Sequence, residues 1–142
     1  HPIDERQVKL QQHHRSLARV LVVDDSRLVR VKTGRLLSQQ GYVVVEATDG
    51  LDALRRIQAC APDLVITDVE MPGLDGFGLT RRLRADPCTA RIPVIMITAA
   101  DERHRIEAAD AGVDTLLGKP YADVELIAHA SRLLEADMTA VA

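Results

Sequence analysis

Five short apolar runs, each followed by polar or turn-forming residues, place the strongest constraint on how this chain can fold. They lie at residues 19–23, 42–46, 64–67, 93–98 and 115–117, and all but the last are rich in valine or isoleucine. Such runs are typical of strands that are buried on both faces of a parallel sheet. Each interval between them leaves room for the crossover of roughly a dozen or more residues that parallel neighbours require.

The intervals carry apolar residues at helical spacing and therefore predict helices. The expected ranges are 27–40, 51–60, 77–85, 101–111 and 123–135, with Asp123 as the cap of the last. The stripes expected to face the sheet include Leu28, Val31, Leu36 and Leu37 in the first helix and Val124, Ile127 and Leu134 in the last. Strands alternating with helices predict an α/β fold, a (βα)5 three-layer sandwich with right-handed crossovers.

Length and composition agree with a single domain. The chain has 142 residues, of which 46% are hydrophobic, and this is enough for a sizeable core. A net charge of −3 argues against a protein that binds nucleic acid or a membrane surface. No apolar run approaches the roughly 20 residues of a membrane span, and no signal peptide is recognisable. Cys60 and Cys88 lack metal-type spacing, so we expect reduced thiols in a cytoplasmic protein.

The domain boundaries follow from where the strand and helix patterns begin and end. We expect residues 1–17 to form a polar leader or linker, residues 18–135 the domain, and residues 136–142 a tail. His13 and His14 lie in the leader with no third or fourth ligand nearby. A solvated linker is therefore favoured there over a metal site.

Polar side chains follow or end four of the five predicted strands. They are Asp24 and Asp25 after the first, Asp68 after the third, Thr98 at the end of the fourth and Lys119 after the fifth. In an open parallel sheet the carboxyl ends of the strands meet at one edge, and sites form there. We therefore expect these residues to form one site.

Three carboxylates in one site repel one another. At about 4 Å and an effective dielectric constant near 20, each pair costs on the order of 4 kcal/mol. Either a proton is taken up or a cation lies among them, and Mg²⁺ suits an all-oxygen set of ligands. Together with the charge of Lys119 and the hydroxyl of Thr98, such a site is equipped for a phosphoryl group. No serine, cysteine or histidine nucleophile accompanies them, so the nucleophile is a carboxylate, and Asp68 is the central one.

Over residues 18–135 the chain resembles the receiver domains of response regulators in two-component signalling. The matching motifs are Val22-Val23-Asp24-Asp25-Ser26, then Asp68-Val69-Glu70-Met71-Pro72-Gly73-Leu74-Asp75-Gly76, then Met96-Ile97-Thr98-Ala99-Ala100 and Gly118-Lys119-Pro120. All four occur in the family's order and at its separations. The resemblance implies a flavodoxin-like fold with strand order 2-1-3-4-5.

The resemblance also implies a magnesium-dependent phosphoacceptor site. By this likeness, Asp68 accepts a phosphoryl group from a histidine kinase or a phosphotransfer domain. Asp25 and Asp68 would bind Mg²⁺ directly, Asp24 partly through water, and Glu70 through its backbone carbonyl. The domain would catalyse only its own phosphorylation and slow dephosphorylation, so it is not an enzyme in the usual sense.

Two further residues have roles by the same resemblance, and a third departs from the family pattern. Lys119 would hold the phosphoryl group and form a cis peptide bond with Pro120. Thr98 would move toward the phosphoryl oxygens and shift the population of an active state. Leu116 stands where many members carry the tyrosine or phenylalanine that rotates with the threonine. The aromatic part of the usual switch is therefore missing.

The implied partners are a histidine kinase or phosphotransfer domain and a downstream protein, with no nucleic acid and no membrane. We expect a cytoplasmic bacterial protein that is a monomer or a weak dimer. The chain is either a single-domain regulator or a piece of a longer protein. The sequences around Asp24 and Lys119 resemble receivers at the end of chemotaxis-type hybrid kinases, including those that control pilus motility.

Two rival functions are compatible with parts of the pattern. A metal-dependent phosphohydrolase with an aspartyl nucleophile would use the same acidic site, but such enzymes usually need a cap over it and the loops here are short. A flavin electron carrier could share the fold. However, Asp24 and Asp25 would repel the phosphate of a flavin cofactor, and aromatic residues make up only 2% of the chain.

Overall fold

The computed structural model describes the backbone of residues 18–141 and the side chains of residues 18–136. The predicted leader, including His13 and His14, lies outside the described residues. The described strands form one sheet and are β1 (Arg19–Val23), β2 (Val43–Ala47), β3 (Leu64–Asp68), β4 (Val94–Thr98) and β5 (Thr115–Gly118). Their order is β2-β1-β3-β4-β5, and all neighbours are parallel. The predicted flavodoxin-like topology is confirmed.

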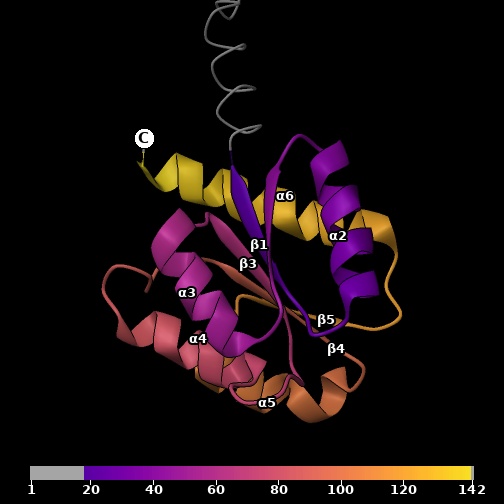
Figure 1. The fold of residues 1–142 in the computed structure, drawn as a ribbon, viewed down its shortest axis with the longest axis vertical. Helices are drawn as coiled ribbons and strands as arrows, with labels where there is room; N and C mark the ends of the chain where they lie inside the picture. Colours follow the sequence, from indigo (N-terminus) through magenta and orange to yellow (C-terminus); the bar gives the residue numbers. More distant parts are fainter. Residues whose placement is uncertain (1–17, 142) are drawn as a thin grey trace, which may run out of the picture.

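The strands are connected by helices that cover both faces of the sheet. The helices are α2 (Arg27–Gln39), α3 (Gly50–Cys60), α4 (Gly76–Ala85), α5 (Asp101–Ala111) and α6 (Asp123–Val141). α2 and α6 lie on one face, and α3, α4 and α5 lie on the other (Figure 1). The three-layer sandwich is therefore confirmed.

Alternate side chains of the central strands enter two separate cores. The core beneath α2 and α6 includes Val20, Val22, Ile66, Leu37 and Leu126. The core beneath α3 and α4 includes Leu21, Val23, Val65, Ile57 and Leu79. Because both faces are covered, the strands lack the polar alternation of a half-exposed sheet.

α5 is anchored less deeply than its neighbours. A third, smaller core lies beneath α4 and α5 and contains Phe77 and Met96. The buried residues of α5 itself are Ala108 and Ala111. Ion pairs join its exposed face to Arg81 of α4, at 3.7 Å to Glu107 and 3.5 Å to Asp110.

The predicted apolar stripes of the first and last helices are partly wrong. Leu28 is 78% exposed, whereas Leu37 is completely buried. At 3.6 residues per turn, nine residues amount to about two and a half turns, which places Leu28 and Leu37 on opposite faces of α2. Val124 is 73% exposed, and Leu126 is buried in its place. Packing against the sheet, rather than the apolar pattern alone, determines which face of each helix is buried.

Both ends of α6 also differ from the sequence prediction. The helix begins at Asp123 itself, and the backbone N–H of Ala122 donates to the Glu125 carboxylate at 3.1 Å. The prediction that Asp123 caps the helix is therefore wrong. α6 continues to Val141 because residues 136–141, expected as part of a tail, contain no glycine or proline to end it. The limits of the domain stay a prediction.

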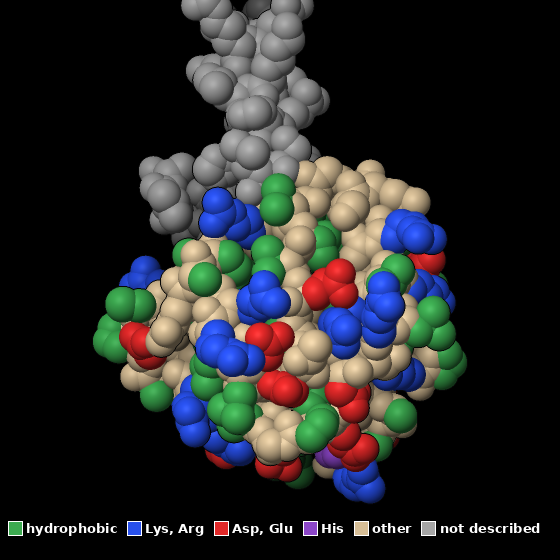
Figure 2. Space-filling model, viewed as in Figure 1, with side chains coloured by type: hydrophobic (Ala, Val, Ile, Leu, Met, Phe, Trp, Pro, Cys, Tyr) green, Lys and Arg blue, Asp and Glu red, His purple; other side chains and the backbone are tan. Residues whose placement is uncertain are grey.

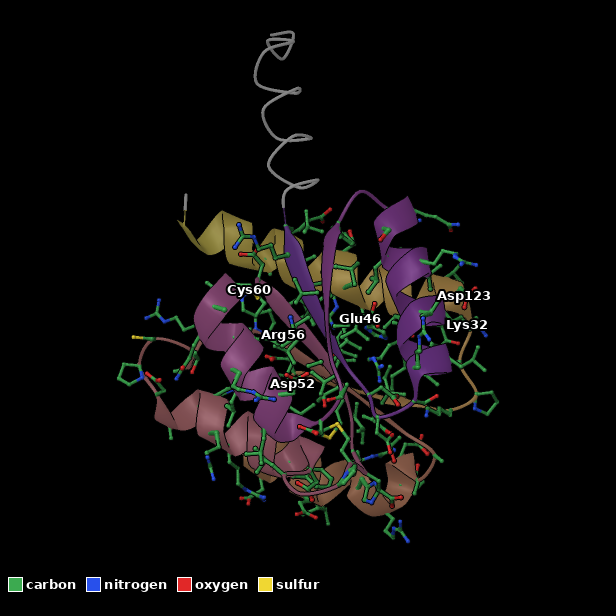
Figure 3. All side chains as sticks on the ribbon, viewed as in Figure 1. Lys32, Glu46, Asp52, Arg56, Cys60 and Asp123 are labelled. Carbon is green, nitrogen blue, oxygen red and sulfur yellow. The ribbon has the colours of Figure 1, made fainter. Side chains whose placement is uncertain are left out.

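Neither cysteine belongs to the buried core. Cys60 lies at the end of α3 (Figure 3) and Cys88 is exposed, and both are free thiols. Burial raises the pKa of the Cys60 thiol, which keeps it protonated near neutral pH. Basic and acidic side chains are interspersed on the face shown in Figure 2. Among the described helices, none has the length and apolar character to cross a bilayer.

Arg84 joins the end of α4 to the segments around β4 and β5. Its guanidinium donates to the carbonyl oxygens of Gly112 at 3.0 Å, Ala90 at 3.1 Å and Ile92 at 2.7 Å. It also pairs with Asp114 at 2.9 Å. One side chain thus satisfies three backbone carbonyls and one carboxylate, a task that suits the five-donor fork of arginine.

We expect Arg84→Met to lower the free energy of unfolding by about 2 kcal/mol, because bonds from a charged donor are lost while the aliphatic stem is kept. Urea denaturation at neutral pH measures the change. Arg82→Met is the matched control, since Arg82 lies on the same helix and is exposed. Equal stability of the two variants would show that these bonds of Arg84 do not contribute to stability.

Candidate functional site at the carboxyl edge of the sheet

Three aspartates meet at the carboxyl edge of the sheet, as the sequence predicts. Asp24 and Asp25 follow β1, and Asp68 is the last residue of β3, the strand that pairs with β1. One carboxylate oxygen from each lies within 4.8 Å of the others. Asp24 is buried, Asp68 is half-buried and Asp25 is exposed, so the cluster opens to solvent on one side.

The loop after β1 fixes Asp24. The Asp24 carboxylate accepts the backbone N–H of Ser26 at 2.8 Å, and the Asp24 carbonyl accepts from the Arg30 guanidinium at 2.7 Å. Ser26 in turn caps α2 by accepting the N–H of Val29 at 3.3 Å. Arg30 also pairs at 3.2 Å with Glu46 of β2, which is labelled in Figure 3. The strand end, the turn and the helix start therefore form one hydrogen-bonded unit.

The loop after β3 fixes Asp68 in a comparable way. Its carboxylate accepts the N–H of Val69 at 2.9 Å. The chain then returns, so that the N–H of Gly76 donates to the Val69 carbonyl at 2.9 Å. A Cβ atom at Gly76 would overlap the carbonyl oxygen of Asp68. This close approach explains a glycine at the start of α4, and it ties the position of Asp68 to that helix.

Thr98 and Lys119 complete the site from the neighbouring strands. Thr98, at the end of β4, is 2% exposed, and the backbone N–H of Lys119 donates to its carbonyl at 2.8 Å. The Lys119–Pro120 peptide bond is cis, as predicted. Thr98, Lys119 and Asp68 line one cleft of about 230 Å³. The structure therefore brings together all five residues that the sequence placed at the strand ends.

Burial and the neighbouring charges shift the pKa values of two of the aspartates. Burial raises the pKa of Asp24, and the charge of Asp25 raises it further, while Lys119 lowers it. The pKa of Asp68 is raised by burial first and then by the charge of Asp24, again against Lys119. At separations near 5 Å and an effective dielectric constant of about 20, each repulsive pair amounts to about 3 kcal/mol. A single lysine therefore does not neutralise the cluster.

The donor set fits a hard divalent cation. The three carboxylates offer oxygen ligands only, and their spread of 4.8 Å is close to that of ligands around one Mg²⁺ ion, which lie about 2.1 Å from the metal. The open side leaves room for the waters that Mg²⁺ keeps. The Glu70 side chain is exposed and pairs with Arg103 at 3.8 Å, so a role for its backbone carbonyl stays a prediction.

Two polar residues of the cleft, Arg103 and His104, were not found by sequence reasoning, and His104 is the one in contact with Thr98. His104 of α5 lines the same cleft as Asp68 and Thr98, and its Nδ1 lies 2.8 Å from the Thr98 hydroxyl. The signal was a histidine six residues after Thr98, in the first turn of a charged helix. Without the geometry of the connecting loop, the direction of its side chain could not be predicted.

Comparison with known proteins identifies the family. A sequence model of the response regulator receiver domain matches residues 20–131. The chain belongs to this family. It is 45% identical over 113 residues to a gliding motility regulatory protein of Myxococcus xanthus, across 79% of the chain and 14% of that protein. It is 44% identical over 117 residues to the response regulator MprA of Mycobacterium ulcerans, across 82% of the chain and 50% of that protein.

A solved structure supports the same conclusion for the receiver fold. The crystal structure of the signal receiver domain of a signal transduction histidine kinase from Syntrophus aciditrophicus superposes with a TM-score of 0.79 at 35% identity, covering 84% of this chain and 91% of that one. The chain spans half or less of the length of the two relatives above. It is a receiver domain of two-component signalling, a signalling family rather than a hydrolase or flavoprotein family. Membership of a hybrid kinase stays a prediction.

The acidic cluster predicts a pH dependence of stability. Because the pKa of Asp24 is raised in the folded state, the unfolded state ionises first, and stability falls as pH rises from about 3.8, the ordinary pKa of aspartate, through the folded pKa. Asp24→Asn removes this loss while keeping an oxygen for the Ser26 N–H. We therefore expect the receiver variant to be more stable than the native chain at pH 7 without Mg²⁺, and the difference to vanish below pH 3.8.

Urea denaturation across this pH range measures the difference, with chelator present. Millimolar Mg²⁺ should stabilise the native chain more than the variant, because the ion binds the folded state. An Asp24→Asn variant that is less stable at pH 7 in chelator would contradict the electrostatic argument.

Proposed function

We propose that Asp68 is the phosphoacceptor of this receiver domain and that Asp24, Asp25 and Asp68 hold the Mg²⁺ ion that its phosphorylation requires. The observation that carries the proposal is the convergence of three carboxylate oxygens within 4.8 Å of one another, beside Lys119 in the same cleft as Asp68. The proposed donor is the phosphohistidine of a histidine kinase or of a phosphotransfer domain, and the partner that reads the result is another protein.

The proposed reaction transfers the phosphoryl group from an imidazole nitrogen of the donor to a carboxylate oxygen of Asp68. A carboxylate oxygen of Asp68 forms a bond to phosphorus as the P–N bond of the phosphohistidine breaks, and the imidazole leaves with that electron pair. The product is an acyl phosphate on Asp68. When bound, Mg²⁺ supplies positive charge to the carboxylates and the phosphoryl oxygens.

The residues of the chain hold the reacting group and its charge. The N–H of Val69 keeps one oxygen of Asp68 oriented at 2.9 Å, which leaves the other oxygen for attack. Lys119 lowers the pKa of Asp68 against the effects of burial and of Asp24, so it favours the ionised nucleophile. After transfer, its ammonium can donate to a phosphoryl oxygen.

The site is exposed enough for a large phosphoryl donor, such as another protein, to approach it. The cleft is lined at its rim by Glu70 and Arg103, both strongly exposed, and no described segment covers Asp25, which is itself exposed. A protein-borne phosphohistidine can therefore approach without a lid opening. This openness favours a signalling acceptor over the phosphohydrolase alternative, which needs a cap.

Incubation with Mg²⁺ and acetyl phosphate, followed by intact mass measurement, tests the proposal. We expect one phosphoryl adduct on the native chain, none on Asp68→Ala, and none in chelator. Asp110→Ala is the matched control, because Asp110 is an exposed carboxylate on α5, away from the cleft, and should leave the adduct unchanged. An adduct of equal yield on Asp68→Ala, or one that forms without a divalent ion, would overturn the assignment.

A second variant separates phosphorylation from its consequence. In Lys119→Ala we expect an adduct to form but not to alter the amide NMR spectrum of α5 and β5, because the bond from Lys119 to the phosphoryl group is lost. Native spectra recorded with and without acetyl phosphate provide the reference.

A further inference from the structure

The hydroxyl of Thr98 has two nitrogen neighbours. The backbone N–H of Ala100 donates to Thr98 Oγ1 at 3.0 Å. His104 Nδ1 lies 2.8 Å from the same oxygen. Thr98 is 2% exposed, so these contacts are made away from bulk solvent. A threonine hydroxyl has one proton and two acceptor positions, and the role of His104 decides where that proton can point.

The surroundings of His104 fix its ring. Its imidazole and the ring of Phe77 of α4 form a T-shaped contact, with centroids 5.4 Å apart and planes at 76°. Phe77 is 3% exposed and belongs to the core beneath α4 and α5. On the other side of the imidazole, His104 Nε2 lies 3.5 Å from the Arg103 guanidinium. Leu116 packs against the same core and has no polar group to offer Thr98.

The neighbour of Nε2 decides which ring nitrogen carries a proton. A guanidinium is a donor only, so its approach to 3.5 Å from Nε2 favours a lone pair there and the proton of the neutral ring on Nδ1. Nδ1 then donates to Thr98 Oγ1. Both acceptor positions of the hydroxyl are occupied, one by Ala100 and one by His104. The Thr98 proton must point elsewhere, and the open direction is the cleft shared with Asp68 and Lys119.

We infer that His104 is a positioning residue for the phosphoryl site, which donates from Nδ1 to Thr98 Oγ1 and thereby directs the Thr98 proton toward the phosphoryl group on Asp68. The inference rests on the proposed function of Asp68. It assigns to a histidine of α5 the polar contact with Thr98, in a chain whose β5 carries the apolar Leu116. Thr98 is oriented before the phosphoryl group arrives, and α5 is linked directly to the reacting edge.

The ring ¹⁵N spectrum of the native chain without phosphoryl donor is the first test. Protonated and unprotonated ring nitrogens resonate far apart, so the spectrum identifies the tautomer of His104. We expect the proton on Nδ1. A spectrum with the proton on Nε2 alone would overturn the inference, because Nδ1 would then accept the Thr98 proton and turn it away from the cleft.

The second test is binding of beryllofluoride, a phosphoryl mimic, in the presence of Mg²⁺, followed by NMR titration. We expect His104→Leu to bind about threefold to tenfold more weakly than the native chain, the size of one lost hydrogen bond. His104→Asn, whose side chain keeps an N–H donor, should recover part of the loss. His129→Leu is the matched control, because it removes a half-buried histidine from α6.

A Thr98→Val background separates positioning from packing. There the hydroxyl is absent, so His104→Leu should have no further effect on beryllofluoride affinity. Unchanged or tighter binding by His104→Leu, or an equal loss in both backgrounds, would overturn the inference. Failure of the native chain to bind beryllofluoride with Mg²⁺ would instead overturn the proposed function, and the ¹⁵N result would then stand as a property of the unphosphorylated site.

Discussion

Repulsion among the carboxylates at one edge of the sheet is the constraint on which the site depends. β1 and β3 are adjacent, so the residues that follow them cannot separate without breaking the strand pairing. The fold therefore holds Asp24, Asp25 and Asp68 together although their charges oppose it. Burial first, and then the charge of a neighbouring carboxylate, raises the pKa values of Asp24 and Asp68. The ammonium of Lys119 relieves part of this repulsion, and a bound divalent cation would relieve more, so the site is sensitive to the arrival of a cation.

The supporting contacts lie in the loops rather than in the strands. Ser26 joins the Asp24 turn to the start of α2, and the approach of Gly76 to Asp68 joins the second acidic turn to α4. The first turns of α2 and α4 are thus in direct contact with Asp24 and Asp68, respectively, or with the residue next to them. A change in charge at the aspartates is transmitted to backbone that also begins a helix, and no long-range mechanism is needed for that first step.

The sequence was sufficient to predict the sheet and the residues at its edge, and the reasons are specific. The strand runs are uninterrupted and apolar because both faces are covered, and parallel strands bring their carboxyl ends together. Asp24, Asp68, Thr98 and Lys119 can therefore be grouped from the sequence alone. Leu28 and Val124 were assigned to the wrong side, because several apolar residues in α2 and α6 leave the choice of the inward face to tertiary packing. His104 was missed because its direction depends on the turn between β4 and α5.

α5 is only weakly anchored to the rest of the structure. Two alanine side chains bury little area, and exposed ion pairs to α4 contribute little to stability. A helix with so few buried side chains opens locally at a lower free energy than helices with larger apolar faces. The hydroxyl of Thr98 touches that helix through one imidazole. A change in the hydrogen bonds of Thr98 therefore acts on the described helix that has the fewest buried side chains.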